Sequence, residues 1–419
     1  MILSDDQGIG DVGCFGAADV KTPNLDRLAA AGVRFTNWHA NSPVCSPSRA
    51  SVLTGKYPQR AGIPQILFSK PNFDVPGLKR GEHTLASELK ALGYRTAAIG
   101  KWHLGSAPDS RPLAQGFDEF FGFYSGWIDY FSHRFYTLGG QPIFHDLWRN
   151  DREVWEEPAY QTELLTREAK AFIGRQSASR PFFLYLAYGA PHYPMMAPQR
   201  YVERFPASMD RDRRLHAASV AALDEGIGAV LDTLDARQLK NTIVYFQSDN
   251  GSTLEVRADH RGRPYHGGSN GIFRGYKGSL FEGGTRVPAI MRWPGHIPAG
   301  RVVDALGMGM DVMPTVLKWA GGSPPSGVDG LDISPMVLEG GASPHDAGFW
   351  GYDGQSCIRE GDWKFLHNPR EALDAPAGTE DWLVNLKEDP AERVNMITRE
   401  PGRAAELRRR LQAWERGLN

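Results

Sequence analysis

The chain has few cysteines, no long apolar run and no excess of charge of either sign. Only three of its 419 residues are cysteine (Cys14, Cys45 and Cys357), too few for a disulfide framework, and the odd number leaves at least one free thiol. We expect Cys14 and Cys357 to be buried apolar side chains. No stretch approaches the roughly 20 apolar residues of a membrane-spanning helix. Because 47 basic residues face 49 acidic ones, the net charge of −2 gives no reason to expect a nucleic acid or a membrane surface as a partner.

Other absences bear on architecture and origin. No period of about 20–50 residues repeats, which excludes solenoids and propellers. No signal peptide is visible, but the chain opens abruptly with "MILSDD", so we expect its start to be trimmed. The one Asn-x-Ser/Thr sequon without proline begins at Asn250, whereas a lysosomal protein normally carries exposed sequons. We therefore expect an exported bacterial protein, periplasmic or extracellular.

The apolar residues that are present alternate between strand-like runs and helical patterns. A helical stretch leads into a strand-like run three times, over 83–103, 162–192 and 216–251. Units of this kind predict an α/β fold with a large, mostly parallel mixed sheet and helices on both of its faces. In such a sheet, ligands bind beyond the carboxyl ends of the strands.

A Gly- and Pro-rich segment, Gly321–Pro335, predicts a domain boundary. Short aromatic runs separated by turn residues follow it, and a helical pattern covers 401–416. We therefore predict a large α/β domain over 1–335 and a small C-terminal α+β subdomain over 336–419. In the subdomain, an antiparallel sheet should pack against the terminal helix.

Polar side chains stand at the end of each predicted strand of the large domain. They are Asp5, Asp6, Lys101, His103, His192, Asp249 and Asn250. Each pair alone is a weak signal, because acids after a strand often cap the next helix and a lone histidine is more often structural. Their convergence on one edge of one sheet makes chance a poor explanation and predicts a site there.

The chemistry of these residues divides them into two groups. The acids and the amide offer only oxygen ligands, which suit a hard divalent cation such as Ca²⁺ or Mg²⁺ rather than zinc. The second group consists of hydrogen-bond donors and cations, and such a set suits a tetrahedral oxyanion such as sulfate or phosphate. Its members are Arg49, Lys101, His103, His192 and Lys277. Glycines on both sides of Lys277 indicate a tight backbone that approaches a ligand.

The stretch "CSPSRASVLTG", which begins at Cys45, resembles the sulfatase signature Cys-x-Pro-x-Arg, whose cysteine is oxidised after translation to formylglycine. Further blocks follow in the order usual for that family, among them "IGKWHLG", "GFDEFFGF", "SDNG", "GYKGSLFEGGTRVPAIMRWPG" and "IREGDWKFL". On these motifs the chain resembles the type I (formylglycine-dependent) sulfatases, and most of all the arylsulfatase A and N-acetylgalactosamine-6-sulfatase group. The resemblance implies an alkaline-phosphatase-like fold and a sulfuric ester hydrolase.

For the metal, the resemblance implies Ca²⁺, with Mg²⁺ as the alternative. Its ligands would be Asp5, Asp6, Asp249, Asn250 and the formylglycine derived from Cys45. That modification implies a formylglycine-generating maturation enzyme as a partner. The plainer interpretation of Cys45 is a packed thiol at a helix start, where the dipole would lower its pKa, but the length of the motif argues against it.

The resemblance also implies a role for each histidine and cation. Arg49 would hold the formylglycine, and Lys101 would contact both it and the sulfate. His103 would hydrogen-bond the aldehyde hydrate, His192 would protonate the leaving oxygen, and Lys277 would bind sulfate. One hydroxyl of the hydrate would attack sulfur, and deprotonation of the other would expel sulfate and regenerate the aldehyde.

The substrate that we expect is a sulfated carbohydrate. The enzyme should remove sulfate from galactose or N-acetylgalactosamine units at the chain end of a glycosaminoglycan or algal polysaccharide. Small aryl sulfates should be side substrates. The pocket walls should come from residues 122–136 and 257–275, and Ser125 is also the candidate for a serine that contacts the hydrate. The candidate wall residues are Ser125, Trp127, Tyr130, Tyr136, His260, Arg263, His266, Asn270 and Arg274.

Two other functions stay open. A phosphodiester or phosphonate monoester hydrolase of the same superfamily would share much of this site. The histidine pair and the single metal favour sulfate, because dianionic phosphate generally recruits more positive charge. A non-catalytic carbohydrate-binding relative would keep the fold, but every expected catalytic position is filled in this sequence.

Overall fold

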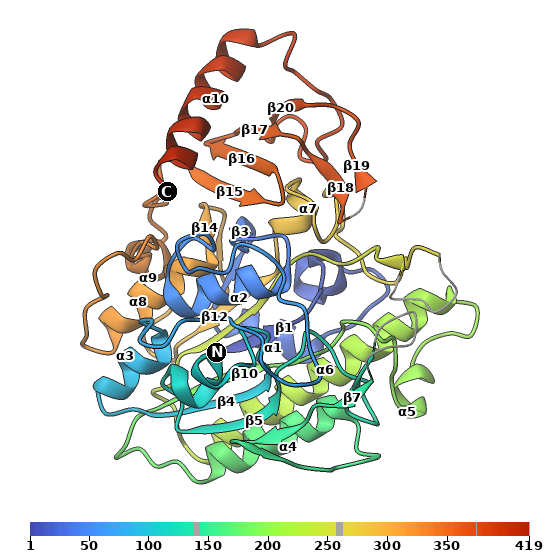
Figure 1. Cartoon of the computed structure of the whole chain (residues 1–419), viewed down its shortest axis with the longest axis vertical. Coiled ribbons are helices and arrows are strands. Elements are labelled where there is room, and N and C mark those ends of the chain that lie inside the picture. The colour runs from blue at the N-terminus through green and yellow to red at the C-terminus, as the bar shows by residue number, and fades with distance from the viewer. Residues whose placement is uncertain (137–142, 257–262, 374, 419) are drawn as a thin grey trace.

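The computed structural model describes residues 1–136, 143–256, 263–373 and 375–418. A ten-stranded sheet lies between helices on both of its faces (Figure 1). Its strands, in spatial order, are β13 (Arg301–Val303), β2 (Val33–Phe35), β12 (Ala289–Arg292), β11 (Val244–Ser248), β1 (Ile2–Ser4), β10 (Phe182–Ala187), β4 (Arg95–Lys101), β5 (Glu119–Phe123), β8 (Trp148–Arg149) and β9 (Arg152–Glu153). The five central strands from β11 to β5 are parallel, and antiparallel pairing begins at β12 on one side and at β8 on the other. The predicted mixed, mostly parallel α/β sheet is confirmed.

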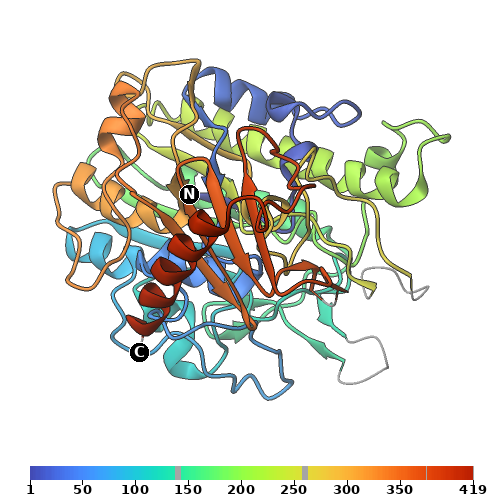
Figure 2. The same ribbon diagram turned by 90° about the horizontal axis from the view of Figure 1, so that it is seen from above.

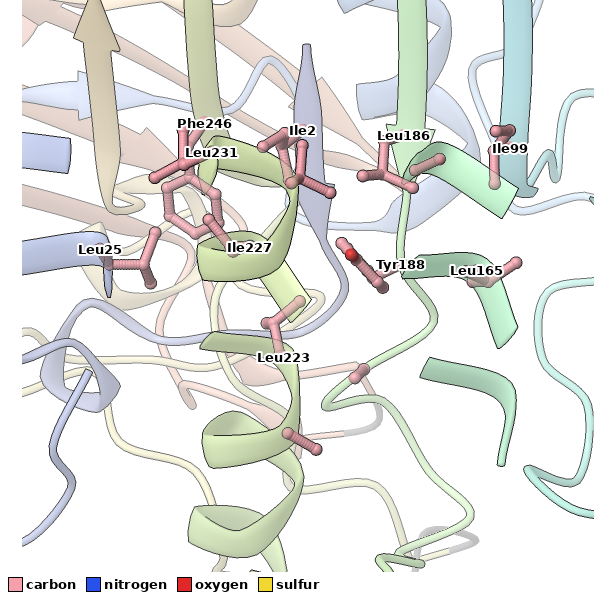
Figure 3. Close-up of a cluster of buried hydrophobic side chains, with 14 of the residues drawn as sticks. Ile2, Leu25, Ile99, Leu165, Leu186, Tyr188, Leu223, Ile227, Leu231 and Phe246 are labelled. Carbon is pink, nitrogen blue, oxygen red and sulfur yellow. The ribbon is translucent and has the colours of Figure 1, made fainter. Parts of the chain in front are cut away.

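Two hydrophobic cores separate the sheet from its helices. The helices on one face are α1 (Pro23–Ala30), α4 (Gln161–Gly174) and α6 (Arg211–Ala236), and those on the other are α2 (Cys45–Thr54), α3 (Leu85–Ala91) and α8 (Val312–Trp319). Because successive side chains of a strand point to opposite faces, Ile2 packs into the first core and Leu3 into the second. Figure 3 shows the first core, where Leu25, Leu223 and Phe246 come from two helices and a strand.

The predicted helices are present, but α6 begins earlier than its apolar pattern indicates. The side chain of Asp210 accepts hydrogen bonds from the amides of Asp212 and Arg213, so the helix starts at Arg211 with a charged first turn. Among the described helices, none is long and apolar enough to cross a membrane. The remaining short elements are α5 (Gln199–Val202), α7 (Glu282–Thr285), α9 (Ser334–Glu339), β3 (Trp38–His39), β14 (Gly307–Met308), β6 (Arg134–Phe135), β7 (Phe144–His145), β18 (Arg370–Ala372) and β19 (Ala375–Pro376).

A second, antiparallel sheet lies at one end of the molecule (Figures 1 and 2). It consists of β15 (Gly348–Tyr352), β16 (Gln355–Glu360), β17 (Trp363–His367) and β20 (Asp381–Asn385). Leu407 and Leu411 of α10 (Pro401–Arg416) pack on its Phe365, so the predicted sheet with a terminal helix is confirmed. The predicted boundary between residues 335 and 336 falls inside α9, and the division into two domains stays a prediction.

The two structural cysteines differ in burial. Cys357 is buried in β16, as expected. The expectation was wrong for Cys14, which is only half-buried. It lies in a short 3-10 turn, Gly13–Phe15, where it packs against the first core and stays partly buried.

Buried charges join the C-terminal sheet to α7, the helix that follows Lys277 in the chain. The Lys364 ammonium of β17 lies 2.9 Å from the Glu282 carboxylate of α7 and 3.2 Å from that of Glu392. Burial raises the pKa of Glu392 to about 7. Burial alone would also raise the pKa of Glu282, but Lys364 and its other cationic neighbours hold that pKa well below its ordinary value. Lys364 is therefore the cation that both buried carboxylates share, and Arg286 and Arg359 add to the stabilisation of Glu282.

We expect Lys364→Met to lower the free energy of unfolding by about 3–5 kcal/mol, because it leaves buried carboxylates without their main counter-charge. Thermal or urea unfolding of the parent and the variant measures this. Arg80→Met is the matched control, since the ion pair of Arg80 with Asp109 is exposed and should contribute less than about 1 kcal/mol. Equal losses in the two variants would contradict the role assigned to Lys364.

Candidate active site

The acidic residues of the predicted metal site meet where two neighbouring strands end. Ser4 of β1 pairs with Ser248 of β11, so the residues that follow each strand lie side by side. The Asp6 amide donates to Asp249 Oδ1 at 3.2 Å, and the side-chain amide of Asn250 donates to Asp6 Oδ1 at 2.7 Å. All of these side chains are buried. The structure therefore brings Asp5, Asp6, Asp249 and Asn250 together, as predicted.

Three buried cations surround these carboxylates. Lys101, the last residue of β4, places its ammonium 2.5 Å from Asp5 Oδ2. The Arg49 guanidinium of α2 donates to Asp249 Oδ2 at 2.8 Å and to the Lys101 carbonyl at 3.1 Å. The Lys277 ammonium lies 3.1 Å from Asp6 Oδ2. Each of these three carboxylates thus lies nearest to a different cation, although Arg49 is also 3.7 Å from Asp5 and Lys277 also pairs with Glu255.

Burial and mutual repulsion raise the pKa of each carboxyl group, and the neighbouring cations lower it. Burial and then the charge of Asp249 raise the pKa of Asp5 to about 7. Burial likewise raises the pKa of Asp6, although Lys277 opposes the shift. Only Asp249, which Arg49 holds, has its pKa lowered in spite of burial. Burial is therefore the main cost of charging Asp5 and Asp6, and repulsion between the carboxylates adds to it.

The donor set fits a hard divalent cation. Asn250 Oδ1 is buried and has no hydrogen-bond partner among the described residues, which leaves an amide oxygen ready to bind a metal. One ligand atom each of Asp5, Asp6, Cys45 and His192 lies within 4.8 Å of the others. Carboxylate and amide oxygens are the ligands that Ca²⁺ and Mg²⁺ prefer. An added positive charge would also relieve the repulsion between the buried acids.

Cys45 is the first residue of α2, a helix whose ten residues are all buried. Its Sγ donates to Asp5 Oδ1 at 3.5 Å, so position 45 adjoins the acidic cluster as predicted. A helix start lowers a thiol pKa, but here burial raises the pKa of Cys45 above its ordinary value. An unmodified Cys45 is therefore a neutral thiol and a poor nucleophile.

His192 lies beside Lys277 and the acidic cluster. Its Nδ1 is 2.6 Å from the Tyr193 carbonyl, which can only accept, so Nδ1 carries a proton. Its Nε2 lies 3.1 Å from the Lys277 ammonium and 3.5 Å from Asp6 Oδ2. The ring nitrogen that faces the site is therefore Nε2.

His103 has the opposite arrangement. Its Nε2 donates to the Leu67 carbonyl at 2.8 Å, and its buried Nδ1 has no partner among the described residues. Burial and the charge of Lys101 hold its pKa well below the ordinary value, so the ring is neutral. Its backbone has a φ of 55°, in the left-handed region that non-glycine residues rarely adopt. The fold thus holds a neutral imidazole with one free acceptor nitrogen.

A cavity of about 280 Å³ opens over Cys45. Its floor is formed by Cys45, His103, His192 and Lys277. Its walls are formed by Ile66, Leu67, Phe68, Ser69, Gly126, Trp127, Phe135 and Tyr193. The sequence analysis missed the segment 66–69. The only signal for it is an apolar run, "ILF", inside a long loop rich in turn residues.

The predicted wall residues divide between the cavity and other places. Trp127 lines the cavity, and buried Ser125 lines a small adjoining pocket with His103. The Tyr130 hydroxyl donates to the carbonyls of Gly189 and His192 and so supports the His192 segment. Tyr136 is half-buried and does not line the cavity.

Of the predicted wall residues between positions 257 and 275, those that the structure describes do not line the cavity. The Arg274 guanidinium pairs with Glu371 and lies over the rings of Phe281 and Trp382. The Asn270 side chain accepts from the Ser252 amide and donates to the Gly275 carbonyl, as a loop support does. Arg263 pairs with Asp212, His266 is exposed, and His260 lies outside the described residues. Substrate contact by any of them stays a prediction.

Comparisons with known proteins agree on one family. The family model described as Sulfatase matches residues 1–323, and the model described as N-sulphoglucosamine sulphohydrolase, C-terminal, matches residues 268–416. The chain is 40% identical over 357 residues to N-acetylgalactosamine-6-sulfatase of Sus scrofa, an alignment that covers 81% of this chain and 66% of that protein. It is 34% identical over 469 residues to arylsulfatase J of Mus musculus, covering 99% of this chain and 75% of that protein.

The fold is also similar to that of a solved structure. The crystal structure of Ps i-CgsB in complex with k-i-k-neocarrahexaose superposes with a TM-score of 0.86 at 30% identity, over 99% of this chain and 91% of that one. The chain spans just under two thirds of the length of the N-acetylgalactosamine-6-sulfatase and three quarters of the length of arylsulfatase J.

We expect Ca²⁺ to stabilise the protein by about 2.7 kcal/mol when its concentration is 100 times the dissociation constant, since it would offset the repulsion between the buried acids. Unfolding with Ca²⁺ and with a chelator measures this. Asn250→Ala should reduce the stabilisation, whereas Glu380→Gln, in a second acidic group with His367 and Asp381, should not. Equal stabilisation of both variants would place the ion elsewhere.

Proposed function

This chain belongs to the type I sulfatases, a family of sulfuric ester hydrolases within the alkaline-phosphatase-like superfamily, and we propose that it removes sulfate from a sulfated carbohydrate. The substrate unit that we propose is galactose or N-acetylgalactosamine at the end of a glycosaminoglycan or algal polysaccharide. N-acetylgalactosamine-6-sulfatase among the relatives and the neocarrahexaose complex among the solved structures support this choice.

One observation carries the proposal. Cys45 lies at the buried start of α2, 3.5 Å from Asp5, on the floor of a cavity that it shares with two histidines and a lysine. A thiol with a raised pKa in that place has little reactivity of its own. As the precursor of a formylglycine, the same residue would present its reactive carbon to the metal ligands and to the cavity.

Two groups would complete the site. Ca²⁺, with Mg²⁺ as the alternative, would be held by Asp5, Asp6, Asp249 and Asn250, and when bound it would act as a Lewis acid toward sulfate oxygens. The formylglycine at position 45, formed by a maturation enzyme, would supply as its hydrate one hydroxyl that attacks sulfur and a second whose deprotonation releases sulfate.

The histidines would move the protons. His192, with Nδ1 held by Tyr193, directs Nε2 toward the cavity. Protonated there, it would donate to the alcohol oxygen as the sulfur–oxygen bond of the ester breaks. His103 is neutral and has an unpaired Nδ1, so it would accept the proton of the second hydroxyl. The two rings would thus have opposite tasks, and each would act through the nitrogen that is not bonded to a backbone carbonyl.

The cations would hold the anion and the nucleophile. Lys277 and Lys101 would bind sulfate oxygens, since both ammonium groups are buried beside the acidic cluster. Arg49 is fixed by Asp249 and the Lys101 carbonyl, and it would orient residue 45 from the same helix. Charge-assisted hydrogen bonds of this kind stabilise negative charge that develops on a transferred group.

For the location of the protein, we propose export to the periplasm or to the extracellular space.

We expect Cys45→Ser to take up sulfate and fail to release it, because a serine offers one hydroxyl and cannot expel sulfate by reforming an aldehyde. Turnover of a small aryl sulfate should fall by roughly 10⁴-fold or more, as when other nucleophiles are removed. Intact-mass measurement after incubation should show one added sulfate per chain. Cys14→Ser, outside the cavity, should keep parent activity. Free turnover by Cys45→Ser would refute the mechanism.

A further inference from the structure

Segment 66–69 is the part of a long loop that lies beside Cys45 and His103, and three hydrogen bonds hold it there. The Leu67 amide donates to Ser46 Oγ at 3.2 Å, next to Cys45, and the Leu67 carbonyl accepts from His103. The Gly126 amide donates to Ser69 Oγ at 3.3 Å. The segment is thus tied to α2, to a histidine of the site and to the residue before Trp127. It is a fixed wall of the cavity.

Phe68, in the middle of this segment, is exposed to solvent, although its neighbours Leu67 and Ser69 are held by hydrogen bonds. Its side chain is 72% exposed, the highest value among the large hydrophobic residues that the structure describes. It also lines the cavity over Cys45. An exposed aromatic ring within a concave site is typical of a ligand-binding surface.

Trp127 contributes a second aromatic ring to the same cavity. Its ring lies at 20° to that of His192 with centroids 6.2 Å apart, and it packs on Phe135 at 4.5 Å. These contacts fix the indole beside the histidine that faces the leaving oxygen. A substrate ring bound to that oxygen must therefore pass close to Trp127.

The charges of the cavity lie on its floor. Among the described lining residues, the titratable groups are Cys45, His103, His192, Lys277 and the Tyr193 hydroxyl, and the others are apolar or aromatic apart from Ser69 and Gly126. A volume of about 280 Å³ is near the lower end of ligand pockets, roughly 300–1,000 Å³, and fits one sugar ring. A second anionic group on that ring would meet no cation among the wall residues that the structure describes.

Resting on the proposed function, we propose that Phe68 and Trp127 form an aromatic wall that binds the ring carrying the sulfate and selects a neutral pyranose with an apolar C–H face. Galactose and N-acetylgalactosamine have such a face, because the axial 4-hydroxyl leaves the C–H bonds at positions 3, 4 and 5 together on one side. A uronate, or a ring with a second sulfate, is disfavoured. Phe68 is then a specificity-determining residue.

The test compares kcat/KM of the parent and of Phe68→Ala on two alkyl sulfates: 6-sulfated N-acetylgalactosamine and ring-free 2-hydroxyethyl sulfate. The loss on the sugar should exceed the loss on the ring-free ester by about 10-fold, mostly through KM, because only the sugar can stack. Phe68→Trp should recover the parent value. Trp155→Ala removes an aromatic ring that is 59% exposed and lies outside the cavity lining, and it should change neither.

The outcomes separate this inference from the proposed function. If the parent chain hydrolyses neither ester and no aryl sulfate, the proposed function fails. If the parent is active but Phe68→Ala loses the same factor on both alkyl esters, the aromatic wall is overturned. A parent preference for a 2-sulfated uronate over the sulfated N-acetylgalactosamine would also overturn it.

Discussion

The structure depends on the confinement of three carboxylates, those of Asp5, Asp6 and Asp249, in one buried place. Burial disfavours each charged carboxylate and like charges repel; burial first, and then the charge of Asp249, raise the pKa of Asp5 to about 7. The chain offsets this cost with a different nearest cation for each acid, and an unpaired amide oxygen on Asn250 marks where a further positive charge fits. The same buried charges that make the site costly make it suited to a metal and an oxyanion.

The fold meets this constraint by bringing distant segments to one sheet edge. Parallel pairing of β1 with β11 places their acidic ends together, and β4, two strands from β1, delivers Lys101. Lys277 comes from a loop whose following helix, α7, is fixed by the buried pair of Glu282 with Lys364 in the C-terminal sheet. The small sheet therefore contributes to the site through the loop that it supports, although none of its residues lines the cavity over Cys45.

The sequence predicted the α/β sheet and the residues at its strand ends, because a helix-strand alternation and a polar strand terminus are local patterns. It placed the start of α6 too late, since the first turn of that helix is charged and its beginning is set by Asp210. Segment 66–69 was missed because its position depends on hydrogen bonds to Ser46, His103 and Gly126, which are distant in sequence. Similarly, nothing local distinguishes Arg274, which pairs with Glu371, from an arginine that faces a substrate.

The most direct test of the central claim, that this site is built for sulfate esters, compares ester classes that share one leaving group. The fully matured, metal-loaded protein would be assayed with the 4-nitrophenyl sulfate, an alkyl phosphodiester and a phosphonate monoester of the same phenol. The account predicts the highest kcat/KM on the sulfate. A preference for the phosphodiester or the phosphonate would contradict it and favour the phosphorus-ester hydrolases of the superfamily, and no hydrolysis of any ester would favour a binding protein.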